Sequence, residues 1–156
     1  MQQKTLIAYF SASGVTARAA REMAEAIGAD LYEIRPAQPY TAADLNWMDR
    51  HSRSTIEMND AACRPAIAEP LEHIQQYDTV FIGFPIWWYV EPRIVDTFLE
   101  HYDFSGKTLI PFATSGGSGI EQAERSLRSH CPGANWKPGK LVNRGAAVWA
   151  KTALES

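Results

Sequence analysis

Residues 11–16 read Ser-Ala-Ser-Gly-Val-Thr and place three hydroxyl side chains around a single glycine. They directly follow the apolar run Leu6–Phe10 and open a helical pattern over Val15–Ile27. The first N–H groups of a helix have no intrahelical partner and point into such a loop. A strand, a short hydroxyl-rich loop and a helix start in this order therefore predict a phosphate-binding site, in which the hydroxyls add donors.

The same loop lacks the features of two common nucleotide sites. It has one glycine and no lysine, so it does not match the G-x-x-x-x-G-K-[ST] pattern that holds nucleoside triphosphates. It also lacks G-x-G-x-x-G, which argues against a dinucleotide pyrophosphate. A phosphate monoester held by neutral donors fits best. The alternative is a turn of Ser and Thr that only caps the helix.

Three consecutive aromatic residues, Trp87 to Tyr89, follow the short apolar run Thr79–Gly83. A strand or a helix would bury only one face of such a run and leave large rings exposed. The run therefore predicts stacking against a flat, largely apolar ring system. The alternative is that Trp87 and Trp88 cover the rim of a sheet or contact a partner subunit.

A third loop, Thr114–Gly119, follows the apolar run Thr108–Ala113 and contains three glycines. Glycine permits close approach of the backbone to a ligand, and the loop N–H groups can donate to its heteroatoms. In parallel α/β sheets, ligands bind beyond the carboxyl ends of the strands. We therefore expect the three loops to meet at one edge of a sheet.

The hydrophobic pattern alternates strands with helices and predicts a doubly wound, five-stranded parallel sheet with helices on both faces, in a single domain spanning 1–156. The strands are expected near 6–10, 31–34, 79–83, 108–113 and 140–142. The first helix is expected over 15–27 and ends at Gly28, and the second runs from Pro92 to about 102. A third helix should begin at a capping box over 118–121 and end before Pro132, and a last one should follow a cap at Asn143. Between 37 and 76 we expect a short helix after Thr41–Asp44, a loop over 49–64 and a helix carrying Leu71 and Ile74.

Composition narrows the class of protein. The 156 residues include 15 basic and 18 acidic side chains, for a net charge of −3, which argues against a nucleic-acid partner. No apolar run approaches the roughly 20 residues that span a bilayer, so no membrane partner and a cytoplasmic location are expected. Cys63 and Cys131 lack a C-x-x-C spacing and are predicted to be free thiols. The four histidines lack ligand spacing, so no metal site is predicted.

Together the three loops resemble the flavodoxin family, over nearly the whole chain and closest to a short-chain subgroup. In that family T/S-x-T-G-x-T binds the phosphate of FMN, and residues 11–16 match it with Ser13 in place of the usual Thr. Residues 83–87 match the family's G-x-P-x-W, which implies that Trp87 packs against the isoalloxazine. The resemblance implies an FMN site formed by Ser11, Ser13, Gly14, Val15, Thr16, Pro85, Ile86, Trp87, Trp88, Thr114, Ser115, Gly116, Gly117, Ser118 and Gly119.

Two departures from the family bear on the redox chemistry. Residues 114–119 carry no aromatic side chain, so one face of the flavin is expected to be open to a substrate. The segment Trp88–Val90 contains no glycine, so the peptide flip that stabilises one-electron-reduced flavin in this family should cost about 1–2 kcal/mol more here. This favours two-electron chemistry.

We therefore expect electron transfer through non-covalently bound FMN, toward a redox partner protein or a small electron acceptor. The alternative is an FMN-dependent NAD(P)H or quinone oxidoreductase. A phospho-receiver domain would need an Asp where Gly83–Pro85 follows the third strand, and a binding module without flavin would not need the first loop. Trp47 and Met48 are candidates for a homodimer interface.

Overall fold

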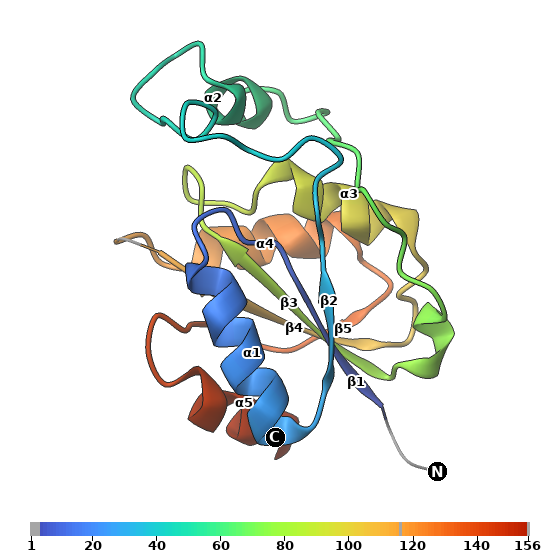
Figure 1. The fold of residues 1–156 in the computed structure, drawn as a ribbon. Coiled ribbons are helices and arrows are strands. Elements are labelled where there is room, and N and C mark those ends of the chain that lie inside the picture. The colour runs from blue at the N-terminus through green and yellow to red at the C-terminus, as the bar shows by residue number, and fades with distance from the viewer. Residues whose placement is uncertain (1–3, 116, 156) are drawn as a thin grey trace.

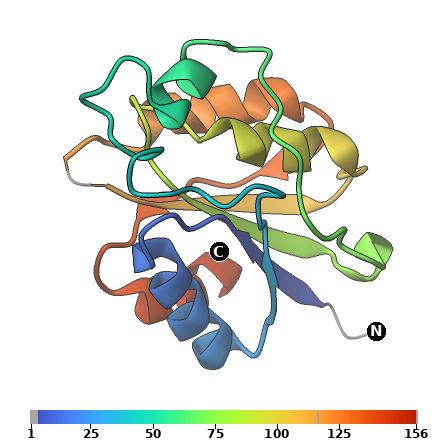
Figure 2. The same ribbon diagram turned by 45° about the horizontal axis from the view of Figure 1, so that its top comes forward.

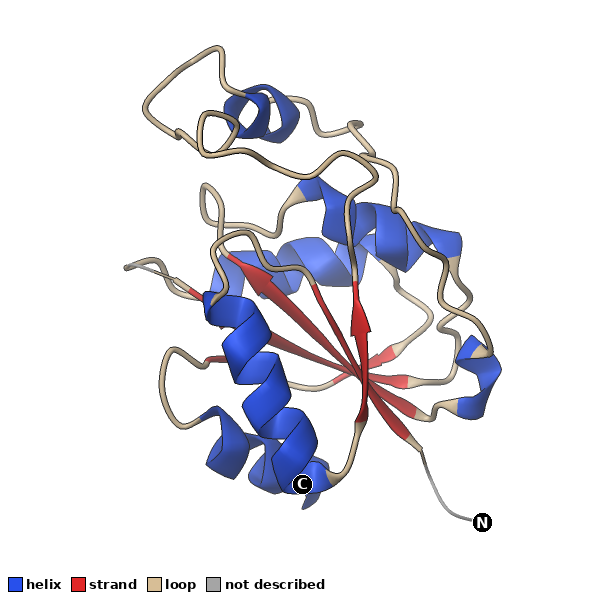
Figure 3. Cartoon of the chain, in the orientation of Figure 1, coloured by secondary structure: helices blue, strands red, loops and turns tan. Residues whose placement is uncertain are grey.

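The computed structural model describes residues 4–115 and 117–155. Its parallel strands form one sheet that lies between two layers of helices (Figure 1). Figure 3 shows the strands splayed by the twist of the sheet, with loops and a short helix above their carboxyl ends. The expected doubly wound α/β fold is confirmed.

The strands are β1 (Thr5–Tyr9), β2 (Asp30–Glu33), β3 (Thr79–Pro85), β4 (Thr108–Thr114), β5 (Asn135–Trp136) and β6 (Lys140–Leu141). Their order across the sheet is β2-β1-β3-β4-β5, all pairings are parallel, and β6 also pairs with β4. The helices are α1 (Val15–Ile27), α2 (Arg53–Met58), α3 (Arg93–His101), α4 (Glu121–His130) and α5 (Ala146–Glu155), with a 3-10 turn η1 at Ile74–Gln76.

Successive side chains of the central strands point to opposite faces of the sheet and pack into two hydrophobic cores. In β1, Leu6 and Ala8 enter the core under α3 and α4, whereas Ile7 and Tyr9 enter the core under α1 and α5. Figure 2 shows these two helix pairs on opposite faces of the sheet. Because both faces are covered, β3 and β4 are almost wholly apolar and buried.

Next to β4, the edge of the sheet consists of two short strands because Pro111 interrupts the pairing there. On the side of β4 that faces β5 and β6, the carbonyls of Leu109 and Ala113 accept N–H groups. Pro111 lies midway between these two residues and faces the same side, but a proline has no N–H to donate. Gly139 passes opposite it, where a Cβ would lie 2.4 Å from the Pro111 carbonyl oxygen. The single strand expected at 140–142 is therefore two short strands, β5 and β6.

Most predicted helices are confirmed, but the 37–76 segment differs. No helix follows Thr41–Asp44, where the described chain forms turns, and α2 instead begins after Ser52 in the expected loop. The helix expected around Leu71 and Ile74 is only the short η1. These helices were misplaced because they are one or two turns long and depend on tertiary packing more than on periodicity.

Helix ends also differ from the patterns that predicted them. Gly28 ends α1 as expected, with φ 69° and its N–H bonded to the Ala24 carbonyl at 2.9 Å. The capping box at 118–121 does not form, since Ile120 occupies the cap position without a side-chain bond. Val15, expected on the buried stripe of α1, is exposed and Thr16 is buried in its place. Among residues 4–115 and 117–155, no helix has the length and apolar character that crossing a membrane requires.

Gly83 gives a test of the packing under the site. A Cβ at this position would lie 2.1 Å from Cζ of Phe112, so we expect Gly83→Ala to lower the free energy of unfolding by about 1–3 kcal/mol. Urea unfolding measures this. Gly117→Ala is the control, because its Cβ would meet nothing within 4 Å. Equal stability of the two variants would show that the Phe112 ring moves aside freely.

Candidate functional site

The ends of β1, β3 and β4 bring the three predicted loops together. Thr114, the last residue of β4, contacts both of the other loops. Its hydroxyl pairs with the Thr16 hydroxyl at 2.8 Å, and its carbonyl accepts the Ile86 N–H at 2.9 Å. Thr16 and Thr114 are both buried, so this junction lies beneath the loops and fixes their spacing.

The first loop wraps around the side chain of Ser11. Its Oγ accepts the N–H groups of Gly14 and Ala17, each at 3.1 Å, and Gly14 adopts the left-handed region with φ 95°. The N–H groups of Val15 and Thr16 find no acceptor among the described residues. Unbonded N–H groups at the start of a helix are the donors that anion binding uses, and phosphate binding by this loop stays a prediction.

Positive charge also surrounds this loop, which the sequence reading did not anticipate. Arg18 and Arg144 line a cavity of about 580 Å³ whose wall includes Ser13 and Gly14. Arg144 lies just before α5, 130 residues from Gly14, so only the fold brings its charge here. The fold thus places two guanidinium groups near the neutral donors of the loop, and one of them, Arg18, also pairs with Glu22 at 3.4 Å.

The aromatic loop after β3 forms a tight hairpin. Trp87 and Val90 exchange backbone hydrogen bonds of 3.0 and 3.2 Å, and the two residues between them, Trp88 and Tyr89, have φ values of 47° and 74°. Two positive φ angles define a type I′ turn, which usually carries Asn-Gly. The positive-φ cost that the sequence argument assigned to a flipped peptide is therefore already present in this turn, so it is not an added cost of one-electron chemistry.

Trp87 and Trp88 have different environments. Trp87 packs edge-on against Phe10, with ring centroids 5.6 Å apart, and against Tyr40 at 5.5 Å. Trp88 and Tyr89 are 41% and 59% exposed at the tip of the hairpin. The expectation that the aromatic run is not core therefore holds for its tip, whereas Trp87 borders the core.

Tyr40 connects this loop to α2. Its hydroxyl donates to Glu57, and the Arg53 guanidinium lies 3.9 Å from the centre of its ring. Burial, and then the hydrogen bond to Glu57, raise the pKa of Tyr40 well above its usual range. Arg53 also pairs with Glu57 at 2.8 Å. This cluster fixes Tyr40 against Trp87.

The loop after β4 is held by Asn143. The Asn143 side chain accepts the Ser115 N–H at 3.0 Å and donates to the Ser115 carbonyl at 2.6 Å. Ser115 Oγ in turn accepts the N–H groups of Gly117 and Ser118. Asn143 was expected to cap α5 and instead clamps the loop, while Gly116 lies outside the described residues.

One cavity of about 750 Å³ joins the three loops. A volume of this size suits a cofactor. Of the predicted site residues, Ser13, Pro85, Ile86, Trp87, Trp88, Ser115, Gly117 and Ser118 line it, together with Ala12 and Tyr89. Leu45, Trp47 and Ser54 complete the lining from the 37–76 segment. These three were missed as site residues because nothing local in that irregular segment shows where it packs.

Comparison with known proteins agrees with this geometry. A family model described as flavodoxin matches residues 4–155. A proposed flavoprotein from Bacteroides eggerthii is 52% identical over 99% of this chain and 97% of its own, with a TM-score of 0.95. Another from Bacteroides uniformis is 52% identical, covers both chains fully and has a TM-score of 0.93.

A more distant structure shares the fold. The flavoprotein from Lactobacillus acidophilus, solved in complex with FMN, is 21% identical over 88% of this chain and 92% of its own, with a TM-score of 0.69. No curated protein matches the chain. The chain belongs to the flavodoxin family.

The hairpin strain gives a second test. Tyr89 is the second residue of the hairpin turn with a positive φ. Because only glycine adopts this region without a steric cost, Tyr89→Gly should raise the free energy of unfolding by about 0.5–1 kcal/mol. Urea unfolding of the FMN-free protein measures the gain. His73→Gly, at φ 60° before η1, should give a similar gain outside the cavity. A loss of stability in Tyr89→Gly would show that the contacts of the ring outweigh the strain.

Proposed function

We propose that this protein binds one FMN non-covalently in the cavity between the three loops and transfers electrons through it. The observation that carries the proposal is one cavity lined by the first loop at Ser13, by the tryptophans of the second and by the glycine-rich third loop, with the open N–H groups of the helix start following directly after Ser13 and Gly14 in the chain. Bound FMN supplies reversible transfer of one or two electrons. The protein supplies the binding site and orients the cofactor within it.

The first loop would hold the phosphate. The open N–H groups of Val15 and Thr16 and the hydroxyls of Ser11 and Ser13 are the donors at the start of α1. Ser11 Oγ already accepts two N–H groups, so its own proton is free to point outward. The Thr16 hydroxyl is bonded to Thr114 and would act mainly by fixing the loop.

The two other loops would hold the ring system. Pro85, Ile86 and Trp87 present the apolar surface against which a flat ring can pack, with Trp88 at its outer edge. On the opposite side, Thr114 to Gly119 would approach the polar edge of the ring. Because Ser115 Oγ satisfies the Gly117 and Ser118 N–H groups in this structure, ring heteroatoms would compete with it for these donors.

Exposed apolar side chains around the cavity support a protein partner. Trp47, Met48 and Tyr89 are 69%, 75% and 59% exposed, and Trp47 and Tyr89 line the cavity itself. Such a patch beside a redox cofactor suits brief docking of an electron donor or acceptor. Whether the same patch forms a homodimer, and whether the protein works in the cytoplasm, stay predictions.

The reductase alternative rests on the size and shape of the cavity. Leu45 and Trp47 extend it beyond the three loops, which would leave space for a flat acceptor over an open flavin face. In that case the enzyme would oxidise NAD(P)H and reduce a quinone. The loop after the first strand lacks the G-x-G-x-x-G pattern of a dinucleotide site, so we place electron transfer first.

Trp87 tests the binding mode. Trp87→Ala should weaken FMN binding by roughly 5- to 150-fold, since aromatic stacking contributes about 1–3 kcal/mol. Quenching of FMN fluorescence on titration measures the dissociation constant. Trp87→Phe keeps an aromatic ring and should retain most of the affinity for FMN. A dissociation constant close to that of wild type would show that the loss in Trp87→Ala comes from stacking and not from misfolding. Equal affinity of wild type and Trp87→Ala would place the ring elsewhere.

Two assays on the FMN-loaded protein separate the functions. We expect the chemically reduced protein to pass electrons quickly to cytochrome c, a one-electron acceptor, when followed by stopped-flow absorbance. Steady-state oxidation of NADH or NADPH with a quinone should not exceed that of free FMN. Turnover of NAD(P)H well above that background, with slow transfer to cytochrome c, would instead establish the reductase.

A further inference from the structure

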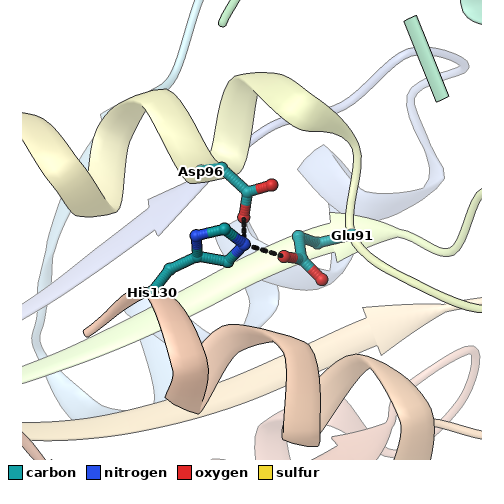
Figure 4. Close-up of side chains that lie close together, drawn as sticks. All are labelled: Glu91, Asp96 and His130. Carbon is teal, nitrogen blue, oxygen red and sulfur yellow. Dashed lines mark ion pairs between the residues drawn. The ribbon is translucent and has the colours of Figure 1, made fainter. Parts of the chain in front are cut away.

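A cluster of three side chains lies behind the aromatic hairpin. Glu91 follows the hairpin directly, Asp96 lies on α3, and His130 is the last residue of α4 (Figure 4). His130 Nε2 lies 3.5 Å from Asp96 Oδ1 and 4.0 Å from Glu91 Oε2. One ligand atom from each of the three residues lies within 4.8 Å of the other two, so one ion could contact all three.

The two carboxylates are fully buried and incompletely bonded. Glu91 and Asp96 are both 0% exposed, and Glu91 Oε1 and both Asp96 oxygens have no hydrogen-bond partner in the described structure. The remaining oxygen, Glu91 Oε2, accepts the Ser126 hydroxyl at 2.8 Å. Buried polar atoms without partners are rare in folded proteins, and a bound ion is one of the few arrangements that satisfies them.

Two carboxylates this close in an apolar interior cannot both stay charged unless a cation or a proton lies between them. Arg93 forms only a long ion pair with this site, with its Nη1 3.8 Å from Asp96 Oδ2. The Arg93 hydrogen bonds go to the carbonyls of Glu57 and Met58 instead.

His130 is oriented as a metal-binding histidine would be. Its Nδ1 lies 3.0 Å from Glu100 Oε2, and Arg64 holds the two Glu100 oxygens at 2.8 and 2.9 Å. With the ring proton on Nδ1 toward Glu100, the Nε2 lone pair points at the two buried carboxylates. A histidine held through one nitrogen by a carboxylate commonly binds metal through the other.

We propose that Glu91, Asp96 and His130 bind a divalent transition-metal ion of the zinc type. One imidazole nitrogen and two carboxylate oxygens are a donor set that Zn²⁺ accepts, with a fourth position left for water. The ion would neutralise the buried carboxylates and join the residue after the hairpin to α3 and α4. It would therefore stiffen the support of the aromatic loop, at a site separate from the FMN cavity.

Zinc titration of the chelator-treated, FMN-loaded protein tests the proposal. Calorimetry should show one Zn²⁺ bound per chain, and Asp96→Asn and His130→Gln should each weaken binding more than tenfold. Glu100→Gln, which removes the carboxylate that holds His130 and pairs with Arg64, should weaken zinc binding about 10- to 100-fold. His101→Gln is the matched control, because His101 is an exposed histidine at the end of α3.

A second measurement does not depend on how the variants fold. The zinc-edge X-ray absorption spectrum of the wild-type protein should show a single imidazole and oxygen ligands at about 2.0–2.2 Å. An all-oxygen or sulfur-containing shell would overturn the proposal. So would absence of stoichiometric zinc binding, or equal affinity in wild type and Asp96→Asn. In those cases a shared proton would occupy the cluster.

Discussion

The site depends on one buried residue, Thr114, at the end of β4. Its hydroxyl pairs with that of Thr16 on the first loop, and its carbonyl accepts the Ile86 N–H on the aromatic loop after β3. These bonds are possible because β1, β3 and β4 are parallel neighbours whose carboxyl ends share one edge. The next residue, Ser115, is clamped by Asn143. Three loops from distant parts of the chain thus have fixed spacing before any ligand binds.

Rigid support around the aromatic hairpin comes from outside the three loops. On one side, Arg53 and Glu57 fix Tyr40 against Trp87. On the other side, Glu91 is buried beside Asp96 and His130. A turn with two non-glycine residues at positive φ persists only where its surroundings determine it. The 37–76 segment and the α3–α4 pair supply those surroundings, which gives the irregular segment a structural role.

Much of the fold followed from local patterns. The buried strands and the longer helices were recognisable because apolar residues repeat with the period of each element over five residues or more. The short α2 was not recognisable, since a helix of six residues gains its stability from packing. The break between β5 and β6 could not be predicted, because it follows from Pro111 facing that edge of the sheet. Which residues face the edge depends on the register of the strands. The capping box at 118–121 failed because loop geometry outweighed a local preference.

The sheet, its longer helices and the three loops could be predicted from the sequence, because each is encoded by residues adjacent in the chain. The side chains that complete the loops became visible only in the folded structure. Trp47 enters the cavity, Arg144 brings charge to the first loop, and Asn143 clamps Ser115. His130, which showed no ligand spacing in the sequence, meets two carboxylates more than 30 residues away. Such contacts join residues that are distant in sequence, so they follow from packing and register and leave no local pattern to read.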